Sequence, residues 1–184
     1  MKKTLLRWGI WCAMKLRIYF LWSLIHQFIF QRKRTKIPTM YTIEDLMLII
    51  RDAMWTADKW WMAGDVIAHP EWAYRNYNET GFIGDCDDYA AFSCHCLNQL
   101  GYHNVQMMSV QWLDLGDNFH GHIVALYRDS TNQMYMISNG FLNPMAVLNE
   151  EDAAFYWPGL QLGELIAWCT FSPNLWHLHK FQLS

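Results

Sequence analysis

Residues 85–140 combine one helix that has clear start and stop signals with strand-like segments joined by short polar turns. Asp85 is a good N-cap residue and Gly101 a good stop, so we expect a helix that begins at Cys86 and ends near Gly101. The apolar and alternating patterns that follow predict three strands, at 105–112, 120–129 and 133–140. A helix followed by antiparallel strands in chain order indicates an α+β fold, with helices packed on an antiparallel sheet.

The flanking segments carry weaker signals. Thr42 and Asp45 form a variant capping box, and the apolar spacing after them predicts a helix from Thr42 to Ala63. Residues 64–84 form a long connection, of a kind that is often functional or carries short helices. Towards the C-terminus the sequence predicts a helical turn at 150–155 and a strand at 164–172.

The chain has 184 residues, of which 53% are hydrophobic, which suits one core of ordinary size. We therefore expect one globular domain, 37–184, preceded by a basic and apolar segment, 1–36. The formal net charge of −3 gives no reason to expect binding to nucleic acid. The five cysteines are odd in number and lack the spacing of a disulfide framework, which favours reduced thiols and a cytoplasmic protein. No cofactor is expected.

Segment 1–36 carries nine Lys or Arg and no Asp or Glu. Its apolar stretch, Ile18 to Phe30, is too short to cross ~30 Å of hydrocarbon as a helix. Three interpretations stay open: a helix that lies on an anionic membrane surface, an uncleaved anchor, or a helix that packs on the domain or on a partner. The first would place the protein peripherally on the inner face of a membrane.

The run GDCDDYAAF places Cys86 at a helix start among three acids. Unsatisfied N–H groups and the helix dipole favour a thiolate there, whereas the neighbouring carboxylates repel it. A histidine partner is therefore needed to take the proton of the thiol. His122, at the start of a predicted strand, is the best candidate for this base, and His120 is the second.

The base needs a group that orients its other ring nitrogen. With a two-residue loop at Ser130 and Thr131, His122 lies directly opposite Asn139, and a slip of register would bring Ser138 opposite instead. An amide oxygen orients an imidazole better than a hydroxyl does. The sequence therefore predicts Asn139 as the orienting residue, with Ser138 as the alternative.

Together, GDCDDYAAF, the helix that ends in LGY, and the strands GHIVALYRD and MYMISNG resemble the transglutaminase-like cysteine peptidase superfamily, especially its bacterial and phage members. The resemblance covers Gly81 to Gly140. It implies a papain-like core with Cys86 as nucleophile and His122 as general base and acid. The third position falls on Ser138 and Asn139, where many members carry Asp.

The resemblance implies a cysteine hydrolase that acts through a Cys86 thioester on a peptide, isopeptide or peptidoglycan amide, or that transfers the acyl group to an amine. The substrate would then be a protein or a peptide. The alternative is a catalytically inactive binding module with the same fold, held at a membrane by segment 1–36. The backbone N–H of Cys86 would be one donor to the oxyanion of such an enzyme. The sequence leaves the second donor open, with four candidates in the long connection: Trp72, Tyr74, Tyr77 and Asn78.

One cluster of thiols and one cluster of acids contain residue types that bind metal ions, but the spacing in each disfavours a metal site. Cys94 and Cys96 are two residues apart on a helix and diverge in direction, so the two thiols cannot readily share a zinc ion. Asp85, Asp87 and Asp88 lack the alternating oxygen pattern of a calcium loop. No metal site is therefore predicted, and Asp88 is expected to stabilise the helix start or a neighbouring loop.

Overall fold

The computed structural model of the protein describes residues 4, 7, 9, 18–56, 66–143, 146–160, 162–175 and 177–183. Its named helices are α2 Ile18–Phe30, α3 Ile43–Asp52, α4 Pro70–Thr80, α5 Cys86–Gln99 and α6 Glu150–Leu160. Its strands are β1 Met54–Trp55, β2 Phe82–Gly84, β3 His103–Leu113, β4 Phe119–Arg128, β5 Met134–Ser138, β6 Phe141–Leu142, β7 Glu164–Phe171 and β8 Leu178–Leu183. The predicted α+β class is confirmed.

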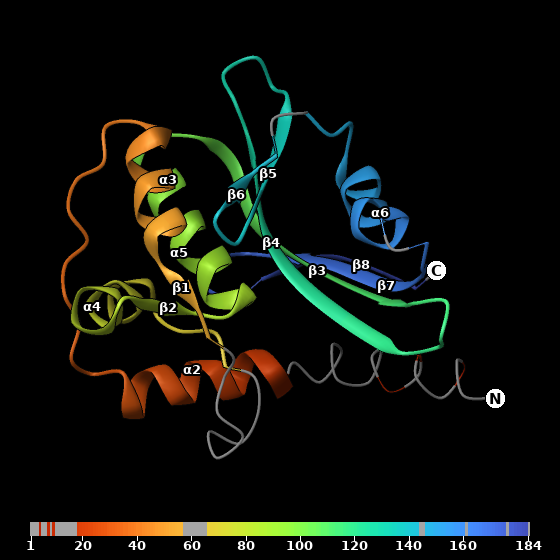
Figure 1. Ribbon diagram of the computed structural model, residues 1–184, viewed down its shortest axis with the longest axis horizontal. Helices are drawn as coiled ribbons and strands as arrows, with labels where there is room; N and C mark the ends of the chain where they lie inside the picture. The colour runs from red at the N-terminus through yellow and green to blue at the C-terminus, as the bar shows by residue number, and fades with distance from the viewer. Residues whose placement is uncertain are drawn as a thin grey trace.

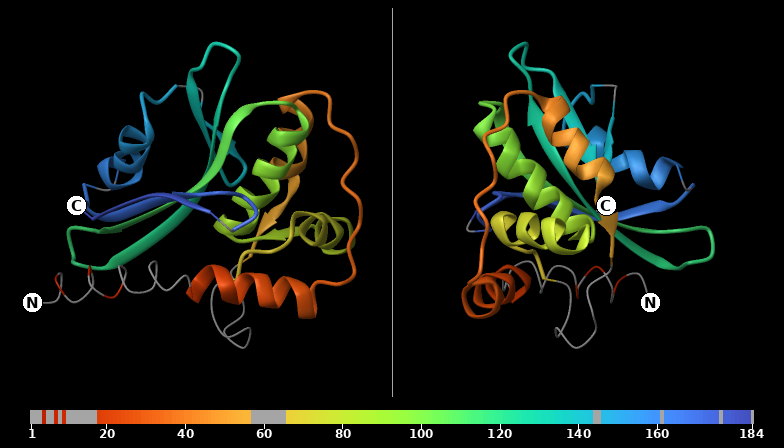
Figure 2. Two further views of the ribbon diagram at one scale, coloured as in Figure 1. Left: turned by 180° about the vertical axis from the view of Figure 1, so that it is seen from behind. Right: turned by 60° about the vertical axis from the view of Figure 1, so that its left-hand side comes forward.

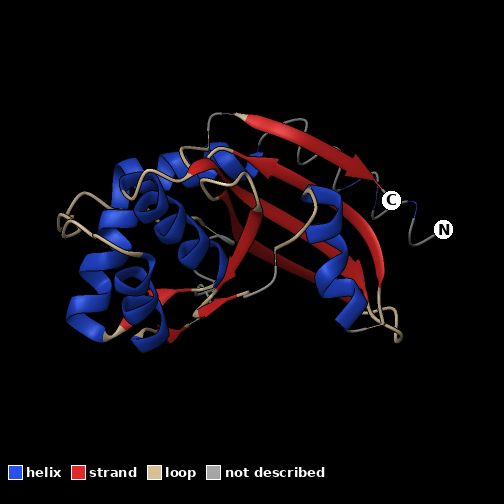
Figure 3. Ribbon diagram, turned by 90° about the horizontal axis from the view of Figure 1, so that it is seen from above, coloured by secondary structure: helices blue, strands red, loops and turns tan. Residues whose placement is uncertain are grey.

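The main sheet has six strands in the order β6-β5-β4-β3-β7-β8, and every neighbouring pair is antiparallel. Helix α5 lies on one side of β4, with α3 and α4 beyond it, and α6 lies on the other side (Figure 1). Seen from above, most helices gather at one side of the strands and a single helix stands at the other (Figure 3). The sheet therefore has two covered faces.

Each face has its own core, because successive residues of a strand point to opposite faces. On β4, Ile123 and Ala125 belong to the core that includes the buried residues of α5, the α5-side core. Val124 and Leu126 belong to the core that includes Ala153 of α6, the α6-side core. Which face a polar residue of β4 occupies thus decides which helix it can meet.

Helix α5 has the predicted limits. Asp85 is its N-cap, Cys86 its first residue, and Gly101 follows its end with a φ of +80°, where a glycine has no steric penalty. The helix is buried on nearly all sides, which its run of small and apolar residues permits. Its first residue therefore holds a fixed position against the sheet.

Helix α3 begins at the predicted capping box, in which the Thr42 hydroxyl accepts from the Asp45 N–H and the Asp45 carboxylate accepts from the Thr42 N–H. The predicted continuation is wrong after Asp52, because Ala53 is extended with ψ 136°. The N–H of Met54 donates to the carbonyl of Gly81 at 2.8 Å, which begins the parallel pairing of β1 with β2. The last residues of the predicted helix, 57–63, lie outside the described residues.

The long connection contains an eleven-residue helix, α4. His69 caps its N-terminus, Pro70 occupies the first turn, and Gly81 ends it in the left-handed region. All four residues considered as oxyanion donors lie on this helix: Trp72, Tyr74, Tyr77 and Asn78. The Tyr77 hydroxyl donates to the Asp52 carboxylate at 2.8 Å, so it ties α4 to α3.

Helix α2 is bound to the domain through polar groups. The Ser23 hydroxyl accepts from the N–H of Ile67 at 3.2 Å, and the Gln27 amide donates to the carbonyl of Ile67 at 2.8 Å. Just after the helix, the Gln31 side chain accepts from the N–H of His69 at 2.7 Å. Leu24 also packs against the α5-side core, so α2 lies against the domain.

The C-terminal third extends the sheet. The predicted helical turn is a full helix, α6, and the predicted strand at 164–172 is β7. Strand β8, which the sequence did not reveal, pairs with β7 at one edge of the sheet. None of the described helices has both the length and the hydropathy needed to cross a bilayer.

Candidate functional site

Cys86 is the first residue of α5 and is half-buried against the α5-side core. The preceding Gly84 has a φ of +140°, and a Cβ at this position would overlap the carboxylate of Asp88. The close approach of the chain just before the helix therefore requires glycine. The sequence correctly predicts a thiol at a helix N-terminus, beside backbone N–H groups that favour a negative charge.

The acids around Cys86 are buried. Asp85, Asp87 and Asp88 gather their carboxylate oxygens within 4.8 Å of one another, an arrangement that could hold a cation. An Asp88 oxygen accepts from the N–H of Ala68 at 2.6 Å, which fastens the segment before α4 to the first turn of α5. Stabilisation of a neighbouring loop, the role expected of Asp88, is confirmed by this bond.

His122 lies on the opposite face of the sheet. It pairs with Val110 of β3, a residue of the α6-side core, and its ring meets Trp157 of α6 edge-on at 4.8 Å between centroids. Its Nε2 is 2.8 Å from the Ser138 hydroxyl oxygen. Burial lowers the pKa of His122 to about 4, so its imidazole is neutral at pH 7.

The predicted contact between Cys86 and His122 is therefore not formed in this structure. The thiol packs with the core under α5, whereas the imidazole packs with the core under α6, and the sheet lies between them. Proton transfer needs the two heavy atoms within ~3 Å, or one water molecule between them. The arrangement keeps the two groups in separate environments.

The predicted orienting residue is also displaced. The β4–β5 pairs join Arg128 to Met134 and Leu126 to Met136, so three residues, 130–132, form the loop instead of two. This register does not place Asn139 opposite His122, and Ser138, the alternative, reaches the imidazole as a diagonal neighbour. Asn139 instead occupies the turn between β5 and β6 with a φ of +48°, and its buried Oδ1 has no hydrogen-bond partner within the described part of the chain.

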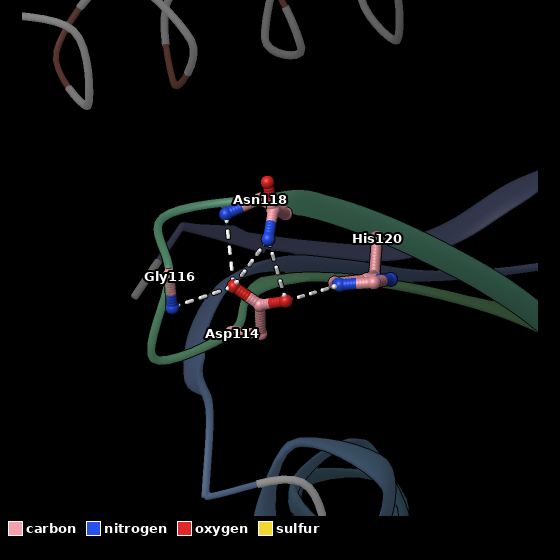
Figure 4. A network of polar contacts seen from close by, with 4 residues as sticks. All are labelled: Asp114, Gly116, Asn118 and His120. Atoms are coloured by element: carbon pink, nitrogen blue, oxygen red, sulfur yellow. Dashed lines mark hydrogen bonds and ion pairs between the residues drawn. The ribbon is translucent and has the colours of Figure 1, made fainter.

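His120, the second candidate base, is part of a turn network at the end of the β3–β4 hairpin (Figure 4). Its Nε2 is 3.0 Å from a carboxylate oxygen of Asp114, and its ring stacks on Trp112. The other Asp114 oxygen accepts from the N–H groups of Gly116 and Asn118, at 2.8 and 2.9 Å. Hydrogen bonds from His120 and Asn118 hold the pKa of Asp114 far below its usual range, so this cluster stabilises the hairpin end.

The other described cysteines are buried thiols. Desolvation raises the pKa of Cys96 and of Cys169 to about 12, and that of Cys94 is raised further. His95, which stands between Cys94 and Cys96 in the sequence, lines a cavity of about 360 Å³ between α2, α4 and α5. The zinc interpretation of this trio gains no support, since His95 belongs to the cavity wall and both thiols are fully buried.

No motif in the sequence pointed to this cavity. His69 and His95 line it together with amide side chains. Burial is the main cause that lowers the pKa of His69 to about 4, and burial also lowers the pKa of His95. The His-Pro pair at the start of α4 is a helix-start signal that could have drawn attention to His69.

No protein-family model matches the sequence, and no curated protein matches it either.

Proposed function

We propose that this protein is a transglutaminase-like domain that keeps a helix and an antiparallel sheet in a papain-like arrangement but works by binding and does not catalyse acyl transfer through Cys86. The observation that carries the proposal is the separation of Cys86 from His122 by the sheet. Across the sheet, His122 cannot take the proton of the Cys86 thiol, and the thiolate is the form that attacks a carbonyl.

The surroundings of Cys86 support the same proposal. Three buried carboxylates lie within two residues of the sulfur, and negative charges disfavour a thiolate. His122 is neutral and could serve as a base, but its Nε2 is already hydrogen-bonded to Ser138. A second candidate, the cysteine hydrolase or acyl transferase implied by the resemblance, is favoured by the position of Cys86 at a helix start and by the His122–Ser138 bond.

Alkylation with iodoacetamide between pH 4 and 9 separates the two candidates. Labelled sites are mapped by mass spectrometry in the wild type and in His122→Gln. The buried Cys94, Cys96 and Cys169 are internal controls, since they should stay unlabelled as long as the fold is intact. A binding module labels Cys86 only as pH approaches ~8.5, the pKa of an ordinary thiol, and at the same rate in both proteins. Rapid labelling of Cys86 at pH 6 that is lost in His122→Gln would overturn the proposal and favour the hydrolase.

A further inference from the structure

Helix α2 is amphipathic in the reverse of the usual sense for a helix on a globular domain. Its polar side chains Ser23 and Gln27 point to the domain and bind the backbone of Ile67. Several of its apolar side chains point outwards, with Leu21 56%, Phe28 74% and Ile29 45% exposed, whereas Leu24 packs against the core. Ordinary packing would bury the apolar side chains and expose the polar ones.

The outward face is continuous. Leu21, Ile25, Phe28 and Ile29 recur at helical spacing on the side opposite Ser23 and Gln27, and Phe30 is also exposed at 65%. A hollow of about 620 Å³ adjoins this face, and its lining includes Ile25, Phe28 and Ile29 together with the charged Arg34. Contiguous apolar surface of this kind marks a site that another phase or molecule covers.

Basic side chains adjoin this face. Exposed Arg32, Lys33, Arg34 and Lys36 follow the helix directly. The Arg32 guanidinium lies 5.9 Å from the centre of the Phe28 ring, so positive charge and apolar surface are presented together. Residues 1–36 contain no Asp or Glu that would neutralise this charge.

We propose that α2 is an interfacial membrane-docking helix that lies in the plane of an anionic lipid surface, with its apolar face among the acyl chains and the basic cluster at the headgroups. The helix has 13 residues, and at ~1.5 Å per residue it is too short to cross the hydrocarbon. Basic and apolar side chains side by side are what an anionic lipid surface binds. A second copy of the chain would bring two such basic clusters together, and like charges oppose that association.

The position of α2 in the fold allows this contact. The helix lies beside α4 at one end of the domain, away from α6 (Figures 1 and 2). Its inward bonds fix the rotation of the helix about its axis, so the apolar face is held outwards before any lipid is met. This inference goes beyond the proposed function, because it holds whether or not Cys86 reacts.

The test is flotation of the full chain with vesicles of phosphatidylcholine alone or with a third phosphatidylserine. The wild type should float with the anionic vesicles, and added salt should weaken the binding because the attraction is partly electrostatic. Phe28→Ser should reduce the affinity about tenfold or more, since one large apolar side chain leaves the interface. Phe155→Ser, which changes a 49% exposed phenylalanine on α6, should bind like the wild type and is the matched control.

Failure of the wild type to float with anionic vesicles would overturn the proposal, as would equal binding by Phe28→Ser. Size-exclusion chromatography tests the alternative that a second copy of the chain covers this face. If the wild type is a dimer and Phe28→Ser a monomer, with no vesicle binding by either, the face is an interface between copies and the membrane assignment is wrong.

Discussion

Replacing His122 with glutamine should make the fold less sensitive to acid. Burial against Trp157 lowers the pKa of His122 from 6.5 to about 4 in the folded protein. Protons therefore bind the unfolded chain more readily than the folded one over this range. The stability linked to His122 is complete above pH 6.5, falls as the pH drops towards 4, and then stays low.

The size of the effect follows from the two pKa values. At pH 4.5 nearly every imidazole of the unfolded chain is protonated, whereas most folded molecules keep His122 neutral. Linkage then gives a loss of about 2 kcal/mol between pH 7 and pH 4.5 from this residue alone. Glutamine does not titrate, and its amide can keep a hydrogen bond to the Ser138 hydroxyl, so the variant should remain close to wild type at pH 7.

The assay is urea unfolding followed by tryptophan fluorescence at pH 7 and pH 4.5. The free energy of unfolding should fall by about 2 kcal/mol more in the wild type than in His122→Gln. Part of the acid loss should persist in the variant, because the pKa of His69 is lowered to about 4 as well. His179→Gln, which changes an exposed histidine on β8, should behave like the wild type.

An equal loss in wild type and His122→Gln, within about 0.5 kcal/mol, would refute this account. It would mean that the imidazole reaches solvent in the folded state, so that the His122 ring is not held between Ser138 and α6.

Two further substitutions test local features of the fold by thermal unfolding. Thr42→Ala should cost about 1 kcal/mol, or ~2–4 °C in Tm, because the capping box of α3 is lost, whereas Thr42→Ser should keep most of it; no change in Tm for Thr42→Ala would contradict the cap. Gly84→Ala should lower Tm much more than Gly101→Ala, since a Cβ at Gly84 overlaps the Asp88 carboxylate while the position at Gly101 is open; equal shifts would show that the chain before α5 can move aside.

Elements defined by local signals were predictable. Helix α5 follows from Asp85 and Gly101, and the central strands follow from their apolar pattern and the polar turns between them. Helix α4 was also within reach, since Pro70 near its start and Gly81 after its end are typical limits of a helix.

Elements decided by distant contacts were not predictable. The apolar spacing of α3 continues past Asp52, yet the chain leaves the helix because the backbone of Met54 pairs with Gly81, far away in sequence. The register of the β4–β5 hairpin depends on Asn132, which has a φ of +65° and lengthens the loop by one residue. The next turn is different, because Asn139 and Gly140 form a two-residue loop between β5 and β6 and Asn-Gly is a common turn pair that can be read from the sequence.

The face of each residue was the decisive unknown for the candidate site. Alternation along β4 fixes that His122 and Ile123 point in opposite directions, but the sequence does not tell which of them faces α5. In the fold Ile123 faces α5, and His122 is left with α6. A single residue of offset thus separates a nucleophile–base pair from two unrelated side chains.

The inward bonds of α2 carry a consequence for how this helix tolerates variation. Ser23 and Gln27 each reach one backbone group of Ile67, and a side chain of another length would miss it. Lipid acyl chains, by contrast, adapt to apolar side chains of any shape. Saturation mutagenesis should therefore find Ser23 and Gln27 intolerant of substitution and the exposed apolar positions of α2 tolerant of any bulky apolar side chain, the inverse of the pattern on helices that line a protein core.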